Sequence, residues 1–130
     1  MNVVLDTNVI VSALLNTNGT PAKILALALN GKVTVLYDNR VIFEYIEVLS
    51  RKEFGFDPET IADVINYFRT EGEFVNSEHI NSKFIDETDK KFYEVYKSGG
   101  AQYLITGNIK HFPQEEGVLA PKDFLEIFAG

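Results

Sequence analysis

The chain has 130 residues, no cysteine and a formal net charge of −7, and 45% of its residues are hydrophobic. These values predict one globular domain over residues 1–130 and exclude disulfides, thiolate nucleophiles and cysteine-based zinc sites. The balance of 12 basic against 19 acidic residues argues against a general nucleic-acid binder but leaves metal-dependent phosphate chemistry open. No apolar run approaches membrane-spanning length and no signal-peptide layout begins the chain, so we expect a cytoplasmic protein without membrane contact.

Short apolar runs alternate with amphipathic stretches along the chain, which predicts strands alternating with helices. In chain order, the expected elements are a strand at 2–5, helices at 9–15 and 20–30, a strand at 33–36, helices at 41–50 and 58–68, a strand at 73–75, a helix at 86–98, strands at 102–105 and 118–119, and a helix at 121–128. This order implies right-handed crossovers and a three-layer α/β domain with a mainly parallel sheet.

Small polar residues mark several of the expected boundaries. Thr20 before Pro21 and Asp57 before Pro58 each place a capping side chain ahead of a proline in the first helical turn. The pair Asp38-Asn39 is expected to form the turn after the second strand.

Two polar segments follow strands of the expected sheet. Asp6 comes directly after the first strand, and Thr106 follows the strand at 102–105. Ligands of parallel sheets bind outside the carboxyl ends of the strands, so these side chains are expected at the same edge.

Three carboxylates are candidates for one site at that edge. Asp6 has an alternative role as a helix cap, and Glu44, on the 41–50 helix, has an alternative as a surface acid. Asp89 lies one turn before Phe92 on an inward-facing stripe, near a helix N-terminus that favours negative charge. Three converging carboxylates would repel one another unless a cation neutralised them. Oxygen ligands without cysteine suit Mg²⁺ or Mn²⁺.

Three stretches, "VVLDTNVIVSALL", "VIFEYIEVL" and "DETDKKFYEVYKSGGAQYLITGNIKHFP", together resemble PIN-domain nucleases. The resemblance runs from end to end with order and spacing intact. It implies a Rossmann-like α/β/α sandwich that binds one or two Mg²⁺ or Mn²⁺ ions and cleaves RNA. Such proteins are often toxins of toxin–antitoxin pairs, are held inactive by a small antitoxin, and commonly form homodimers.

The resemblance also assigns roles to residues. Asp6, Glu44 and Asp89 would be the catalytic metal ligands, and the supporting residues would be Thr7, Asn8 and Thr106. Asn108 stands where the family has a fourth acid, and its amide oxygen would bind a metal without adding charge. Asp86 is a second candidate for that ligand, although it also suits the N-cap of the following helix.

Other residues are candidates for contacts beyond the metals. Lys110 and the pair Lys90-Lys91 are candidates for RNA phosphates, each weighed against a plain solvated lysine. His111 stands where many relatives have another acid. It is expected to be exposed, as is His79, and the sequence shows no partner for either histidine. The apolar residues Phe54, Phe56 and Phe68 are candidates for a partner surface.

Several other functions are disfavoured by the motifs. A haloacid-dehalogenase-type phosphatase would need an acid where Asn8 stands, and the chain has no P-loop, no G-x-G-x-x-G and no G-x-S-x-G motif. The serious alternative is a PIN-like fold without catalysis, retained as an RNA-binding or protein-interaction module. Asn108 and the acidic net charge favour that alternative, and metal-dependent RNA cleavage discriminates against it.

Overall fold

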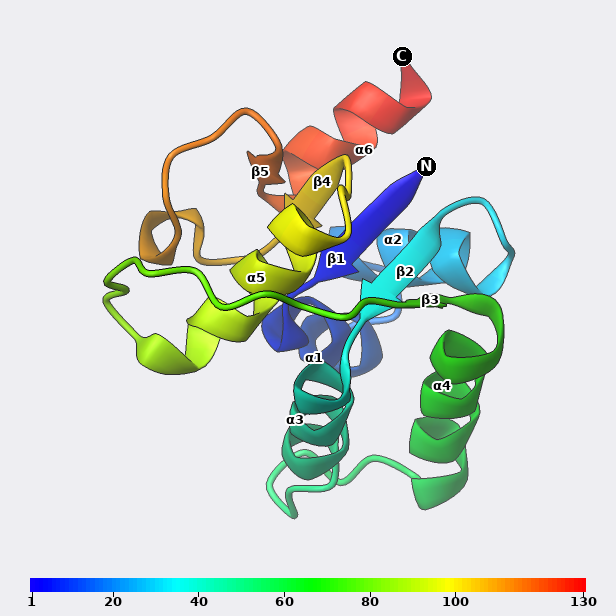
Figure 1. Cartoon of the computed structure of the whole chain (residues 1–130). Coiled ribbons are helices and arrows are strands. Elements are labelled where there is room, and N and C mark those ends of the chain that lie inside the picture. Colours follow the sequence, from blue (N-terminus) through cyan, green and yellow to red (C-terminus); the bar gives the residue numbers. More distant parts are fainter.

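A five-stranded parallel sheet forms the centre of the computed structural model, which describes all residues from 1 to 130 (Figure 1). Its strands are β1 (Asn2–Leu5), β2 (Thr34–Tyr37), β3 (Glu73–Phe74), β4 (Tyr103–Ile105) and β5 (Val118–Leu119), in the spatial order β3-β2-β1-β4-β5. In the central strand, Val3 pairs with Val35 on one side and Tyr103 on the other. The prediction of a mainly parallel sheet is confirmed.

Helices cover both faces of the sheet. They are α1 (Thr7–Leu15), α2 (Thr20–Leu29), α3 (Asn39–Leu49), α4 (Pro58–Glu71), α5 (Lys90–Ser98) and α6 (Pro121–Ala129), with two short 3₁₀ helices, η1 (Glu87–Asp89) and η2 (Ile109–His111). Helices α1, α2 and α6 pack together behind the strands, whereas α5 crosses β1, β2 and β4 in front of them (Figure 1). This is the three-layer α/β architecture that the sequence predicts.

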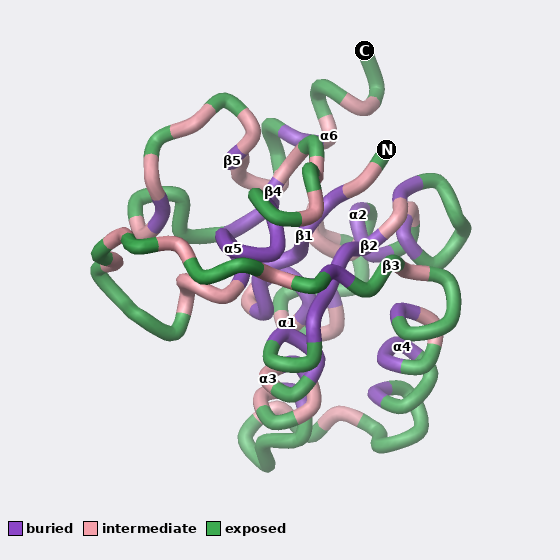
Figure 2. Tube along the Cα trace, in the orientation of Figure 1, coloured by how far each residue is buried: buried purple, intermediate pink, exposed green.

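Burial of the strands in the core explains why their sequences are continuous apolar runs. Val3, Val4 and Leu5 of β1 are fully buried, and Figure 2 shows the buried residues gathered along the central strands and the inward sides of the helices. Each such side chain stabilises the fold by roughly 1.5–3 kcal/mol through burial. Strands covered on both faces carry no polar alternation, so period-two patterning is absent here.

Several boundaries differ from the prediction. Asp38 does not form a turn: β2 continues to Tyr37, and the Asp38 side chain caps α3 by accepting a hydrogen bond from the Val41 backbone N–H at 3.0 Å. Thr20 is already helical, and Gly19 is the N-cap of α2. Asp57 does cap α4, as predicted, through the Glu59 N–H at 2.9 Å.

The helix expected at 86–98 consists of two pieces, η1 followed by α5. Asp86 caps η1, and its carboxylate accepts hydrogen bonds from the Thr88 N–H at 2.9 Å and the Thr88 hydroxyl at 2.7 Å. The capping role that the sequence suggested for Asp86 is therefore observed.

The segment between β3 and η1 is tied down by one buried acid. Glu94 of α5 is 2% exposed, pairs with Arg40 at 2.7 Å, and accepts a hydrogen bond from the Ile80 N–H at 2.8 Å. His79 also lies 3.2 Å from Glu94, a partner that the sequence did not reveal. These contacts hold the long connection along α5 (Figure 1).

None of the helices combines the length and the apolar content that crossing a bilayer requires.

Among the phenylalanines expected at a partner surface, Phe68 is 1% exposed and belongs to the core. Phe54 and Phe56 stack on each other, with ring centroids 5.5 Å apart.

Candidate functional site

Asp6 lies at the carboxyl end of β1, where the strand order reverses between β1 and β4. This is the position at which open parallel sheets bind ligands. The Asp6 side chain does not cap α1. Its Oδ2 instead accepts hydrogen bonds from the Thr106 hydroxyl at 2.7 Å and the Asn8 amide at 3.3 Å, and Asp6 is 4% exposed. Capping therefore does not explain this acid.

The environment of Asp6 disfavours its negative charge. Burial raises the pKa of Asp6 from 3.8 to about 6, although the hydrogen bond from Thr106 acts in the opposite direction. Repulsion from Asp89 and Glu44 also raises this pKa, which shows that the three predicted acids share one electrostatic environment. A cation close to Asp6 would restore its charged form.

Glu44 faces inward from α3 and does not lie free on the surface. Its Oε2 accepts a hydrogen bond from the Thr7 hydroxyl, and its Oε1 lies 2.7 Å from the ammonium of Lys91. The side chain of Glu44 is 23% exposed and that of Lys91 is 15% exposed. The surface alternative for Glu44 is thereby excluded, and Lys91, which was a candidate contact for RNA phosphates, pairs with this acid.

Tyr45, the neighbour of Glu44, fixes α3 against the end of the central strand. Its hydroxyl donates a hydrogen bond to the Leu5 carbonyl, and its ring is fully buried. Burial and the negative charges of Asp6 and Glu44 hold the pKa of Tyr45 well above its usual range. The phenol therefore stays neutral and acts as a donor that positions α3.

Asp89 ends η1 directly before α5, so it sits at a helix N-terminus as predicted. One oxygen of Asp89 lies 3.1 Å from Nδ1 of His111, in η2. The sequence did not reveal this partner of His111. Burial raises the pKa of Asp89, and the negative charges of Asp86 and Glu44 raise it further, against the hydrogen bond to His111.

The turn after β4 connects to Asp6 through its backbone. The Asn108 N–H donates to the Thr106 hydroxyl at 3.0 Å, and the Gly107 N–H donates to the Asn8 side chain at 3.1 Å. Asn108 itself is exposed, and its side chain makes no capping hydrogen bond. Thr106 and Asn8 thus have the supporting contacts predicted for them, whereas Asn108 lies at the rim.

The donor set suits a hard divalent ion, but the side chains as they lie form no group of three acids or histidines that could hold one. Asp6, Glu44 and Asp89 offer only oxygen ligands, which Mg²⁺ and Mn²⁺ prefer. The two outer acids are instead engaged by Lys91 and His111. An ion would have to draw these carboxylates together.

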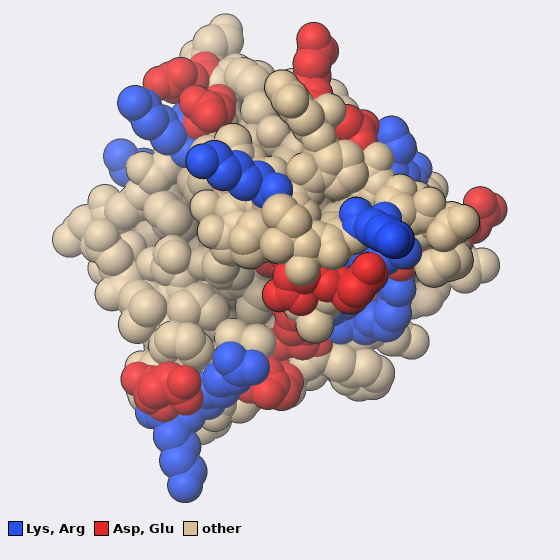
Figure 3. Space-filling view, turned by 90° about the vertical axis from the view of Figure 1, so that its left-hand side faces the viewer, with Lys and Arg blue, Asp and Glu red and all other residues tan.

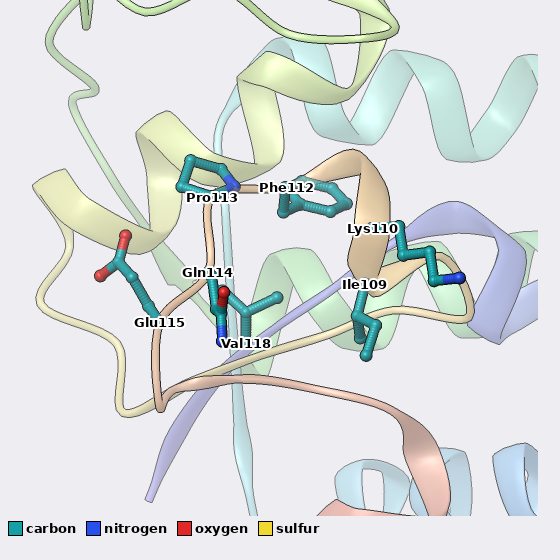
Figure 4. A pocket seen from close by; sticks show the side chains of 7 residues that line it. All are labelled: Ile109, Lys110, Phe112, Pro113, Gln114, Glu115 and Val118. Atoms are coloured by element: carbon teal, nitrogen blue, oxygen red, sulfur yellow. The ribbon is translucent and has the colours of Figure 1, made fainter.

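The lysines predicted to contact RNA differ in exposure. Lys110 is exposed and Lys90 half-buried, and in Figure 3 the basic side chains stand among acidic and uncharged ones. A pocket of about 360 Å³ lies beside η2, and its lining includes none of the three acids. Figure 4 shows Lys110 at one end of this pocket, extending away from Glu115.

Comparison with known proteins identifies relatives of the chain. The family description that matches is PIN domain, over residues 2–110, a range that contains all three acids. The chain is also 31% identical over 112 residues to an uncharacterized protein of Methanocaldococcus jannaschii. The aligned region covers 83% of this chain and 71% of that protein.

Proposed function

Because the chain belongs to the PIN domain family, whose members are generally metal-dependent nucleases, we propose that it is a Mg²⁺- or Mn²⁺-dependent endoribonuclease. The observation that carries this proposal is Asp6. It is a buried carboxylate at the switch point of the sheet, it does not cap its helix, and two further acids raise its pKa. Such an arrangement costs stability unless it binds something.

The proposed roles rest on the resemblance to PIN-domain nucleases, and the contacts of the site support them. Asp6, Glu44 and Asp89 hold one or two divalent ions, and Asn108 adds a neutral oxygen at the rim. A bound ion supplies a water of lowered pKa and positive charge that stabilises the phosphate. Thr106 orients Asp6 through Oδ2, which leaves the other oxygen without a side-chain partner.

Other side chains complete the site. Thr7 orients Glu44 through Oε2. Lys110 and Lys90 contact backbone phosphates of the RNA, which positions the strand without reading its bases.

We further propose that the protein is the toxin of a toxin–antitoxin pair, that it forms a homodimer, and that a small antitoxin covers its acidic site. The resemblance to such toxins supports this. Phe43, next to Glu44 on α3, is 64% exposed and offers an apolar contact beside the site. A short reading frame adjacent to the gene is the expected genomic observation.

A second candidate is a PIN-like module that binds RNA or protein without cleaving. The pairing of Glu44 with Lys91 and the neutral Asn108 favour it, because both reduce the negative charge available to a metal. The two functions differ in one measurable property, which is metal-dependent cleavage.

The test is cleavage of a mixed RNA substrate by purified protein with Mg²⁺ or Mn²⁺, and with EDTA. We expect cleavage only with metal, and we expect Asp6→Asn and Asp89→Asn to abolish it while circular dichroism stays unchanged. Asp63→Asn, which removes an exposed acid of α4, is the matched control and should cleave like the wild type. Undiminished cleavage by both site variants would refute the assignment, and RNA binding without cleavage would favour the second candidate.

A further inference from the structure

The ammonium group of Lys91 lies 2.7 Å from Oε1 of Glu44, one of the carboxylates that the proposed function assigns to a metal ion. We propose that Lys91 is the internal counter-ion of Glu44 in the metal-free protein, and that the Lys91–Glu44 ion pair and divalent metal binding exclude each other. This inference rests on the proposed function, because it concerns the same acidic site.

Both oxygens of Glu44 are in use. Oε2 accepts the Thr7 hydroxyl, and Oε1 pairs with Lys91 at 2.7 Å. Thr7 is 4% exposed and lies in the first turn of α1, so its short side chain cannot swing away. Lys91 has a long flexible stem, and therefore its contact is the one that an incoming ion replaces.

Lys91 also has contacts that are independent of Glu44. Its ammonium donates to the Thr88 carbonyl and lies 5.2 Å from the ring centroid of Phe92. A lysine displaced from Glu44 therefore keeps a neutral acceptor and an aromatic face. The exchange does not require the whole side chain to become solvated.

Electrostatics makes the two states exclusive. In the metal-free protein the three acids repel one another, and the side chain of Lys91, only 15% exposed, places a positive charge among them. A divalent ion on the same carboxylate would be repelled by that ammonium at short range. Metal affinity is therefore lowered by the free energy of the ion pair that must be broken.

The decisive variant is Lys91→Met, which removes the charge and keeps an unbranched apolar stem. Its matched control is Lys83→Met, which removes the same charge from an exposed lysine that makes no ion pair. Lys91→Arg keeps the charge and reports whether the shape of the side chain alone changes the affinity for Mn²⁺.

The measurement is a Mn²⁺ titration of the purified proteins by calorimetry, with thermal melting in EDTA and in Mn²⁺. We expect Lys91→Met to bind Mn²⁺ about fivefold more tightly than the wild type, the effect of one partly buried ion pair. Lys83→Met should change the affinity less than about twofold, as expected of a screened surface charge. In EDTA, Lys91→Met should melt below the wild type, and Mn²⁺ should raise its melting temperature more than that of the wild type.

Unchanged or weaker Mn²⁺ binding by Lys91→Met would overturn the inference, as would equal tightening by both methionine variants. If Lys91→Met fails to fold, Lys91→Arg decides: affinity like that of the wild type supports the counter-ion role, and a fivefold gain contradicts it. The wild type separates this inference from the proposed function. Mn²⁺ binding and RNA cleavage by the wild type without an effect of Lys91→Met refute the inference alone, whereas no Mn²⁺ binding by any protein refutes the proposed function.

Discussion

Asp6 destabilises the metal-free protein at neutral pH, and removing its charge should reveal this. Its pKa is raised from 3.8 to about 6 in the folded state, chiefly by burial. The folded state therefore binds the Asp6 proton more tightly than the unfolded state does. Stability is fully present well below pH 3.8, where Asp6 is protonated in both states, and it falls as the pH rises from 3.8 through 6.

A shift from 3.8 to about 6 corresponds to roughly 3 kcal/mol once Asp6 is fully ionised. Asparagine keeps the size of the side chain and still accepts the Thr106 hydrogen bond, but it carries no charge. We therefore expect Asp6→Asn to be more stable than the wild type by about 1–3 kcal/mol at pH 8 in EDTA, and by less near pH 4. Saturating Mn²⁺ should remove the advantage, because it stabilises only the wild type.

The assay is urea unfolding followed by circular dichroism at pH 4, 6 and 8. Asp63→Asn serves as the control, since this exposed acid should give no pH-dependent difference. If Asp6→Asn is less stable than the wild type by the same amount at pH 4 and pH 8, then Asp6 carries no electrostatic strain and the reasoning fails.

Two further substitutions test the contacts around the site. Thr106→Val removes the hydroxyl that donates to Asp6 and accepts from Asn108. We therefore expect urea unfolding to show a loss of about 1–3 kcal/mol in stability and carboxyl NMR to show a higher Asp6 pKa, with Thr106→Ser restoring both. An unchanged Asp6 pKa would contradict this prediction. For Glu94, burial raises the pKa but the hydrogen bonds from Arg40 and Ile80 lower it below its ordinary value. Glu94→Gln should therefore cost about 1–3 kcal/mol at pH 7 and less as the pH falls below the ordinary pKa of a glutamate, and a cost independent of pH would show that its charge plays no role.

The architecture could be predicted because buried parallel strands appear in the sequence as continuous apolar runs. Val3, Val4 and Leu5 form an uninterrupted apolar run, and so do Leu104 and Ile105. The error at Asp38 has a physical cause, since aspartate serves turns and helix caps equally well. What decides between the two is the pairing of β2 with its neighbours through Tyr37, which is a long-range property.

The candidate site was predictable in part for the same reason. Asp6 and Thr106 meet because parallel strands deliver their carboxyl ends to one edge. Lys91 and His111 were named from the sequence, but their pairing with Glu44 and Asp89 was missed because these partners lie on other elements. Which way Lys91 points depends on how α5 is rotated against α3, and no local spacing records that rotation.

The three acids differ in the side chains that the protein places beside them. Glu44 has Lys91, and Asp89 has His111 within 3.1 Å. Asp6 has only neutral hydroxyl and amide donors, although it is the most buried of the three. Neutral donors offset part of the cost of burial but cannot cancel a charge, so Asp6 is the acid for which an external cation changes the energy most. An ion that centres on Asp6 and draws in Glu44 and Asp89 would therefore gain its main interaction from the acid whose side-chain partners are only a hydroxyl and an amide.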